Sequence, residues 1–313
     1  MNTKTAVVQK PKRKKLKKNE LELFSSCFLP LLSLFIFNYI PMFGIVIAFK
    51  DYRYNLGIWG SRWVGFNNFK FFFESDTFTT ILWNTLSMNL IFIVVGIIAS
   101  VLVAILLFEI SSRNATKVYQ TMLITPNFLS WVVVSYMVYA FLNPQYGLLN
   151  GLLKLMGKEA VDWYATPNAW PVILTISSVW KHVGMDSVVY YAALMGLDTS
   201  LFEAAEVDGA NKIQVTMKII LPMLVPLISV LTILKIGNIF RADFGLFYQL
   251  TRNVGLLYSK TDVIDTYIFR TMRVVGDMGM SSAVGLLQSV VGFVLVILTN
   301  HVSKKINPDN ALF

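Results

Sequence analysis

The stretch SLFEAAEVDGANKIQVTMKIILPMLVP, residues 200–226, joins two short helix patterns through a turn and leads into a long apolar segment. Ser200 and Glu203 have the spacing of a capping box, which predicts that a helix begins there. Gly209 can adopt a left-handed conformation and turn the chain before a second amphipathic stretch. Pro222 stands where the apolar segment begins. The pattern predicts a helix–turn–helix that lies on a membrane surface and leads into a span.

This helix–turn–helix is too apolar for a solvated linker. Leu201, Phe202 and Val207 give its first helix an apolar side. Lipid headgroups, other helices of the protein or a partner protein must cover that side. The plainer interpretation is an interfacial connector in which Glu203 only caps a helix, and the residues by themselves leave both interpretations open.

Apolar segments long enough to cross a bilayer flank the loop. A transmembrane helix needs about 20 mostly apolar residues. Charged residues make up 14% of the chain, against about 25% in globular proteins, and the mean hydropathy is +0.60. The sequence therefore excludes an ordinary soluble fold and predicts an all-α integral membrane protein with about six transmembrane helices. We expect the spans at 23–49, 80–108, 118–142, 169–197, 218–240 and 280–302.

The basic residues predict the orientation of the chain. Eight Lys and Arg residues precede position 20, and basic residues beside a first span mark the cytoplasmic side. An even number of spans returns Lys304 and Lys305 to the same side. We expect a basic cytoplasmic tail at 1–22, a transmembrane domain at 23–302 whose inner loop is 198–222, and a second cytoplasmic tail at 303–313.

A net charge of +9 is also compatible with a protein that binds nucleic acid. The basic cluster lies beside an apolar segment, and no aromatic interleaving or nucleic-acid motif accompanies it. We therefore expect membrane lipid as a partner and no nucleic acid.

Enzyme chemistry has little basis in the sequence. The segment GLLKLMGKE, residues 151–159, resembles a phosphate-binding loop, but its glycines are one residue too far apart and no Ser or Thr follows the lysine. His182 and His301 lie far apart without metal-ligand spacing. The single cysteine, Cys27, excludes an internal disulfide. We expect a chain that is not an enzyme and has neither a catalytic residue nor a metal site.

Polar residues inside the expected fourth and fifth spans are the candidates for a substrate path. Charged side chains in a membrane are costly and face a cavity or a partner. In one interpretation, Lys181, Asp186 and Lys235 form an ionic network that only holds the helices together. In the other, aromatic rings stack on sugars and polar groups donate hydrogen bonds to hydroxyls or carboxylates. The path residues would then be Trp180, Lys181, Asp186, Tyr190, Asn238 and Arg241.

The inner loop resembles a known family signature. Glu203-Ala204-Ala205, then Gly209, and then Ile219, Leu221 and Pro222 match the EAA motif of permeases in binding-protein-dependent ABC importers, with the spacing of that motif. Other segments are similar to the subgroup that imports oligosaccharides and complex carbohydrates. These segments are IPMFGIVIAFKDY (40–52), SWVVVSY (130–136) and RADFGLFYQL (241–250).

The resemblance implies a transport subunit of a bacterial cytoplasmic membrane. The EAA loop of such permeases docks in a cleft of an ATPase subunit, and here the docking residues would be Glu203, Ala204, Ala205, Asp208 and Gly209. It implies as partners a second, different permease, two ATPase subunits and an extracytoplasmic solute-binding protein. ATP and Mg²⁺ would bind to the ATPase subunits, so this chain would carry no cofactor.

Two other classes of function are compatible with a polytopic chain. An ATP-independent secondary transporter would need ion-coupling carboxylates in its spans, and only Asp186 is a clear candidate. A membrane scaffold or receptor subunit would move no substrate. Within the ABC class, a peptide or an amino acid is the alternative cargo.

Overall fold

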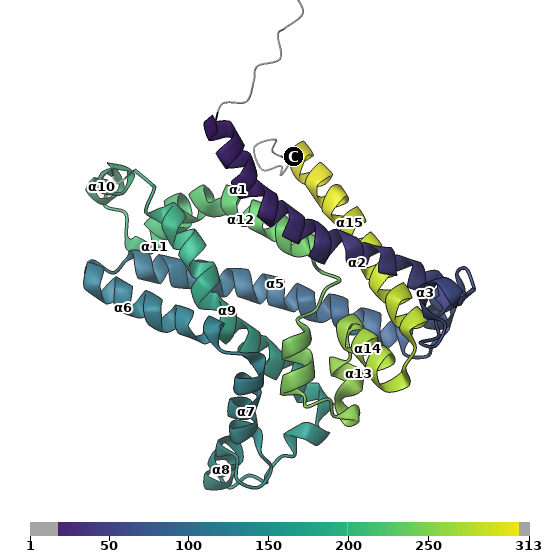
Figure 1. The fold of residues 1–313 in the computed structure, drawn as a ribbon. Helices are drawn as coiled ribbons and strands as arrows, with labels where there is room; N and C mark the ends of the chain where they lie inside the picture. Colours follow the sequence, from purple (N-terminus) through teal and green to yellow (C-terminus); the bar gives the residue numbers. More distant parts are fainter. Residues whose placement is uncertain (1–17, 199, 307–313) are drawn as a thin grey trace, which may run out of the picture. The chain divides into compact units, whose positions relative to one another are not determined.

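The structure, a computed structural model, describes residues 18–198 and 200–306 (Figure 1). The chain divides into two compact units, Met1–Val46 and Ile47–Phe313. Most of the expected basic tail and the end of the C-terminal tail lie outside the described residues, which exclude 1–17, 199 and 307–313.

The first unit is a helical segment that changes its winding along its length. It runs through α1 (Lys18–Leu34), the π-helical turn η1 (Phe35–Tyr39) and α2 (Ile40–Met42). Pro41 has no backbone N–H to donate, and the wider π turn ends two residues before it. An apolar span covers Ser25–Phe49, close to the first span expected from the sequence.

The second unit begins with short elements rich in aromatic residues. The chain enters it along the 3₁₀ helix η2 (Phe43–Phe49). β1 and β2 are antiparallel, with Lys50 opposite Trp63, and they are the only strands in the part of the chain that the structure describes. Trp59 and Phe66 are largely exposed, as is typical of a membrane–water interface. The elements are β1 (Lys50–Asp51), α3 (Gly57–Gly60), β2 (Arg62–Trp63) and α4 (Asn67–Phe73).

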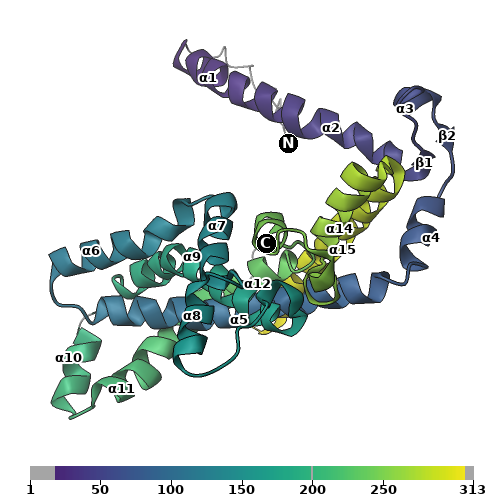
Figure 2. The same cartoon turned by 90° about the horizontal axis from the view of Figure 1, so that it is seen from below.

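Two long helices, α5 (Phe78–Phe108) and α9 (Trp170–Leu194), pack against each other along their length. Tyr190 and Leu194 of α9 meet Val101 and Ala104 of α5 in a buried apolar cluster. Because these side chains are buried, lipid does not reach them. The packed pair of α5 and α9 forms the central support of the second unit. Figure 2 shows α6 beside the same helices.

The segment that follows α5 is sharply bent. The sequence predicts one span at 118–142, but the structure has α6 (Arg113–Ile124), η3 (Thr125–Phe128) and α7 (Trp131–Leu142), with 98° between the two halves. Ser130 caps α7 by accepting a hydrogen bond from the N–H of Val133. The two halves therefore form a broken span or a re-entrant loop rather than one straight span.

Short helices precede the fifth expected span. α10 (Ser200–Val207) is followed by α11 (Lys212–Val215), η6 (Thr216–Ile220) and α12 (Leu221–Gly237), the last three of which are continuous. α12 ends three residues before the expected boundary at 240. A Cβ at Gly237 would lie 2.4 Å from Cγ2 of Val296, so glycine lets α12 approach the last helix closely.

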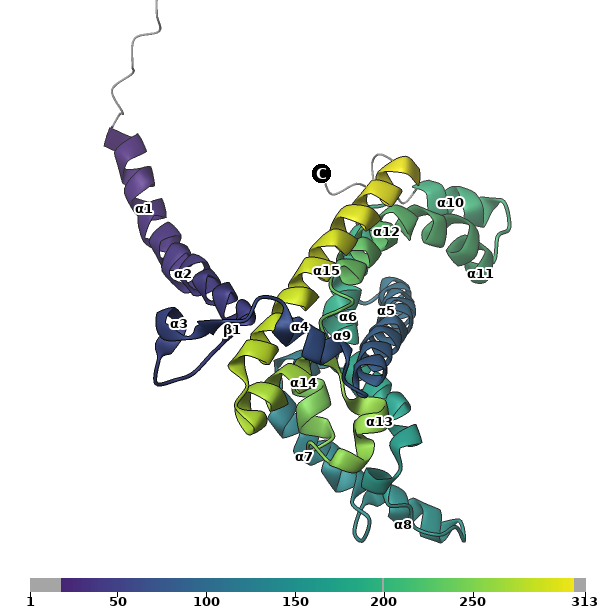
Figure 3. The ribbon, with the colours of Figure 1, turned by 90° about the vertical axis from the view of Figure 1, so that its right-hand side faces the viewer.

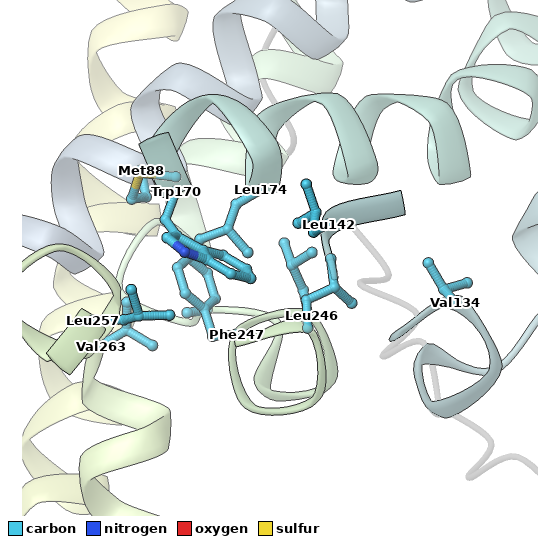
Figure 4. Close-up of a cluster of buried hydrophobic side chains, with 11 residues drawn as sticks. Met88, Val134, Leu142, Trp170, Leu174, Leu246, Phe247, Leu257 and Val263 are labelled. Carbon is cyan, nitrogen blue, oxygen red and sulfur yellow. The ribbon is translucent and has the colours of Figure 1, made fainter. Parts of the chain in front are cut away.

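The remaining elements complete the core. Trp170 at the start of α9 lies against Leu174 and Phe247, and all three side chains are buried (Figure 4). α15 packs along α12 and α14. The elements are α8 (Leu148–Leu155), η4 (Trp163–Ala165), η5 (Pro167–Ala169), η7 (Leu246–Leu250), η8 (Gly255–Leu257), α13 (Tyr258–Thr261), α14 (Ile264–Arg270), η9 (Thr271–Val275) and α15 (Met278–Ile306).

The all-α membrane class is confirmed. By length and composition, four helical segments of the described residues can cross a membrane, and the bent α6–α7 pair raises the number to five. α9 is 25 residues long but carries Lys181, His182 and Asp186, and it is not among these apolar segments. The expected count of about six spans therefore differs from the apolar count because one long helix is polar in its middle.

Candidate functional site

The first candidate site is the loop between α9 and α12. Its first helix, α10, begins at Ser200, whose N–H donates to the Asp198 carboxylate at 2.9 Å. This hydrogen bond holds the pKa of Asp198 below its usual value. The helix start therefore depends on Asp198, where the sequence predicts a capping box of Ser200 and Glu203.

The turn after α10 requires glycine. Gly209 has φ of +77°, in the left-handed region that residues with a Cβ rarely adopt. The N–H of Ala210 donates back to the carbonyl of Ala205 at 2.9 Å, as in a Schellman motif. Gly209 thus fixes the direction in which the chain leaves α10, as the sequence predicts.

The second half of the loop carries its own cap. Asn211 and Gln214 form a reciprocal capping box at the start of α11, with distances of 2.9 and 2.8 Å. Lys212 forms an exposed ion pair with Glu109 at the end of α5. The ring of Phe202 packs against Phe108 at 5.6 Å between centroids. The loop is therefore held against the end of α5 by apolar contact on one side and by charge on the other.

The five predicted docking residues lie together on this loop. Glu203, Ala204, Asp208 and Gly209 are exposed, while Ala205 is buried. Within the second unit, α10 and α11 lie at the opposite end from α8 (Figures 1 and 3). The exposed residues are available to a partner protein at one end of the helix bundle.

The second candidate site is a cavity of about 510 Å³ among α5, α9 and the end of α12. This volume is in the range of small-molecule sites, which is about 300–1,000 Å³. Asp186, Asn238 and Arg241, three of the predicted path residues, line it. The lining also includes the polar side chains Asn89, Ser100, Ser178, His182, Lys235 and Asp243.

An irregular segment, 238–243, forms one wall of the cavity. Backbone that leaves a helix within a membrane must find other hydrogen-bond partners. Asn89 of α5 donates to the carbonyl of Ile239 at 2.7 Å, and Gln288 of α15 donates to that of Phe240 at 2.6 Å. Asp265 accepts from the N–H of Ala242 at 2.7 Å. Side chains from three helices therefore support a break in the α12 region, as in the discontinuous helices of transporters.

Some charged side chains in the cavity have partners within the described part of the protein, and one does not. Lys235 pairs with Asp186 at 2.6 Å, which joins α12 to α9. Asp243 accepts hydrogen bonds from the indole of Trp131 and from a backbone N–H. Arg241 is exposed and belongs to none of the ion pairs found in residues 18–198 and 200–306. Its guanidinium is therefore available to a ligand.

Lys181, another predicted path residue, does not line the cavity. Its side chain is 6% exposed, and its ammonium donates to the carbonyls of Pro126, Asn127 and Leu129. These carbonyls lie at the break between α6 and α7, where helical hydrogen bonds are missing. Lys181 thus does not line the cavity, and its ammonium bonds to the carbonyls of the bend, while Asp186 pairs with Lys235.

The two predicted aromatic path residues also lie outside the cavity lining. Tyr190 is 2% exposed and belongs to the apolar cluster between α5, α9 and α12. Trp180 is partly exposed but is not among the residues that line the cavity. Neither ring is therefore placed to stack on a sugar in this cavity.

Comparison with known proteins identifies the family. Residues 93–308 match the family described as the binding-protein-dependent transport system inner membrane component. The chain belongs to this family. The resemblance seen in the loop 200–226 is thereby confirmed.

Relatives of this permease cover nearly its whole length. Protein LplB of Bacillus subtilis (strain 168) is 34% identical over 279 residues, which are 89% of this chain and 87% of LplB. The polygalacturonan/rhamnogalacturonan transport system permease protein YteP of the same organism is 33% identical over 319 residues, covering 98% and 99% of the two chains.

Solved structures show the same fold. A chain from a bacterial ABC transporter involved in the import of the acidic polysaccharide alginate has a TM-score of 0.84 and 32% identity, covering 93% of this permease and 97% of that chain. A second structure shows a bacterial alginate ABC transporter in complex with an alginate pentasaccharide-bound periplasmic protein. Its matching chain has a TM-score of 0.82 and 32% identity, over 92% and 96% of the two chains.

Sequence reasoning assigned several polar cavity residues of the permease to no site, among them Asn89, His182 and Asp243. Asn89 is one of many polar residues in a long helix, and no sequence signal separates it from the others. Ser178, His182 and Asp186 are spaced by four, so they share one face of α9. This four-residue spacing is the sequence signal that could have placed His182 beside Asp186 in the cavity. Asp243 follows the helix break, where a contact with Trp131 cannot be read from sequence.

Proposed function

We propose that this permease carries an oligosaccharide across the bacterial cytoplasmic membrane, with the cavity bounded by 238–243 as its part of the path. The observation that carries the proposal is the exposed Arg241 beside amide and hydroxyl groups in a cavity among apolar helices. Hydroxyl-rich ligands need several donors and acceptors at once, which Asn89, Asn238 and Ser178 provide. The carbohydrate cargo of YteP and of the alginate transporter supports this class.

ATP hydrolysis on separate subunits provides the energy. In this proposal the exposed loop residues Glu203, Asp208 and Gly209 dock on an ATPase subunit, which binds ATP and Mg²⁺. The continuous helix from Lys212 to Gly237 then links the docking loop to the cavity wall. A displacement at one end of this rigid helix changes the position of Asn238 at the other.

Further partners are needed in this proposal because a single permease chain encloses the substrate path on one side only. One chain lines one side of the cavity, so a second, different permease closes it, and a pair of ATPase subunits serves the two. An extracytoplasmic binding protein delivers the cargo, as the periplasmic protein in the alginate complex does for alginate. The basic residues before position 20 and Lys304 and Lys305 support an orientation with both termini in the cytoplasm.

Reconstitution tests the function. The tagged chain is purified from its native membranes with its partners, placed in liposomes with the binding protein, and assayed for uptake of galacturonate and maltose oligomers with and without ATP. We expect ATP-dependent uptake of at least one of these saccharides. Arg241→Gln is expected to reduce uptake of the acidic oligomers about tenfold, because a charge-assisted hydrogen bond is lost.

A matched control is Arg273→Gln, since Arg273 is also exposed but does not line this cavity. It should leave uptake unchanged. Recovery of the chain without partners, with saccharide uptake independent of ATP, would assign the protein to the secondary transporters. Failure to move any of these saccharides would refute a carbohydrate cargo.

A further inference from the structure

A second polar pocket lies away from the cavity, between α7 and η7. Its volume is about 200 Å³. Tyr136 and Tyr248 contribute aromatic rings to its wall, and Gln249, Arg252 and Asn253 contribute polar groups. A surface that faces only lipid would be apolar, because polar and charged groups in hydrocarbon are costly. The composition of this pocket therefore suits a polar occupant better than lipid.

The backbone at one side of this pocket is strained. Arg252 and Asn253 have φ of 54° and 52°, and they are the non-glycine residues with positive φ among those that the structure describes. Such conformations cost energy and persist where the surroundings enforce them, often at functional sites. Here the Thr251 hydroxyl donates to the carbonyl of Phe247 at 2.6 Å, and the Tyr258 hydroxyl donates to the Asn253 side chain at 2.9 Å.

The strained turn presents a guanidinium without an anionic partner. The Arg252 guanidinium lies 4.2 Å from the centroid of the Tyr139 ring, a cation–π contact that orients it. None of the ion pairs in residues 18–198 and 200–306 includes Arg252. Burial raises the pKa of the neighbouring Tyr164 to about 12 against the opposing effect of Arg252, so this phenol stays neutral. The positive charge remains available to a ligand.

The pocket and the cavity are adjacent along α7. Trp131, at the first position of α7, donates to Asp243 at 2.7 Å, and its ring lies 6.0 Å from that of His182. Both of these residues line the cavity. Ser135 lines the pocket one helical turn further along α7, about 6 Å away. α7 therefore links the pocket to residues of the cavity wall, and only a ligand made of several linked units would reach both.

We propose that this pocket is a second saccharide subsite, which binds an acidic sugar unit of an oligosaccharide whose next units lie in the cavity. The guanidinium of Arg252 matches a carboxylate with two parallel donors. Gln249 and Asn253 hydrogen-bond to hydroxyls. The rings of Tyr136 and Tyr248 cover the apolar face of the sugar. The subsite rests on the proposed carbohydrate cargo and adds to it a requirement for chain length and negative charge.

Arg252→Asn tests the subsite without changing the backbone, because asparagine accepts a left-handed conformation. The assay is uptake of galacturonate oligomers of two to five units by the complete reconstituted transporter. We expect uptake of the longer oligomers to fall about tenfold, while uptake of the dimer, which fits in the cavity alone, stays the same. Arg273→Asn is the matched control on an exposed arginine outside both sites.

Direct occupancy is measured with a thiol probe. Tyr136→Cys is introduced together with Cys27→Ser, because Cys27 is exposed and would also react. A membrane-impermeant maleimide then reports access to the pocket. With galacturonate pentamer at five times its dissociation constant, modification of position 136 should slow about sixfold, and maltopentaose should protect less.

The outcomes separate the subsite from the function. Unchanged uptake of all oligomer lengths by Arg252→Asn, or no protection of position 136 while uptake is intact, refutes the subsite alone. Import of maltopentaose but of no galacturonate keeps the carbohydrate function and refutes the acidic subsite. If no saccharide is imported, both proposals are wrong.

Discussion

The docking loop and the cavity are built in opposite ways. The loop gathers Glu203, Asp208 and Gly209 within seven residues of sequence, and its conformation depends on local hydrogen bonds. The cavity gathers side chains from helices that are far apart in the chain, such as Asn89 and Lys235. A local site keeps its form when distant helices move, whereas an assembled site changes with them. This difference suits a loop that receives a displacement and a cavity that responds to it.

The largest effect should come from the turn of the loop. Gly209→Val places a β-branched side chain at a φ of +77°, which that residue does not adopt without strain. We expect ATP-dependent uptake to fall on the order of 100-fold, because coupling between the two sites is lost. Saccharide binding to the pocket between α7 and η7, measured by protection of a cysteine at position 136 from thiol labelling, should be unchanged.

Gly209→Asn is the matched control, since asparagine tolerates the left-handed region and should retain most of the uptake. Equal uptake by the valine variant and the wild type would show that the loop is only a connector.

Removal of Lys181 should destabilise the bend between α6 and α7. Lys181→Met leaves the carbonyls of Pro126, Asn127 and Leu129 without their donor. We expect the free energy of unfolding to fall by about 2 kcal/mol or more, because buried acceptors lose their partners. Thermal unfolding of the purified complex measures this.

Lys154→Met, on the exposed face of α8, is the control and should change little. Equal unfolding temperatures for the two variants would mean that the α6–α7 bend does not depend on the ammonium of Lys181.

The ion pair across the cavity should contribute a smaller amount. Asp186→Asn leaves Lys235 without its carboxylate, and both side chains are about one-third exposed, so water reduces the loss. We expect a destabilisation on the order of 1 kcal/mol. The double variant Asp186→Asn with Lys235→Met should recover most of it in a double-mutant cycle. Additive losses would show that the two side chains do not interact.

The smallest effect is expected at the charged contact of the loop. Lys212→Ala removes an ion pair with Glu109 in which the lysine side chain is 81% exposed. Such pairs contribute at most about 1 kcal/mol, so stability and uptake should stay close to those of the wild type. A large loss of uptake would show that the loop is positioned by charge as well as by the turn at Gly209.

The sequence predicted the docking loop, which is local in sequence, better than the cavity, which is assembled from distant helices. The helix, the turn at Gly209 and the second helix lie within 200–226, and their signals are cap residues and apolar spacing over a few positions. Only the cap of the first helix was misplaced, since Asp198 accepts the hydrogen bond at its start, and the second helix has a separate capping box of Asn211 and Gln214.

The cavity could be predicted only in part. Asp186 and Arg241 were found because a charge in an apolar segment is conspicuous. Lys181 has the same signal, but its donors are used by carbonyls more than 50 positions away, which no spacing reveals. Tyr190 has an aromatic ring of the kind that stacks on sugars, but residues of two other helices bury it. Whether a polar side chain is free or already bonded is a property of packing.

The contact of Lys181 also sets an order of events during synthesis of the chain. The carbonyls of Pro126, Asn127 and Leu129 enter the membrane before Lys181, which follows them by 52 to 55 residues. The break between α6 and α7 therefore has no ammonium to cap it until α9 has left the ribosome. Lys181 can therefore contribute to the bend only after α9 has been synthesised.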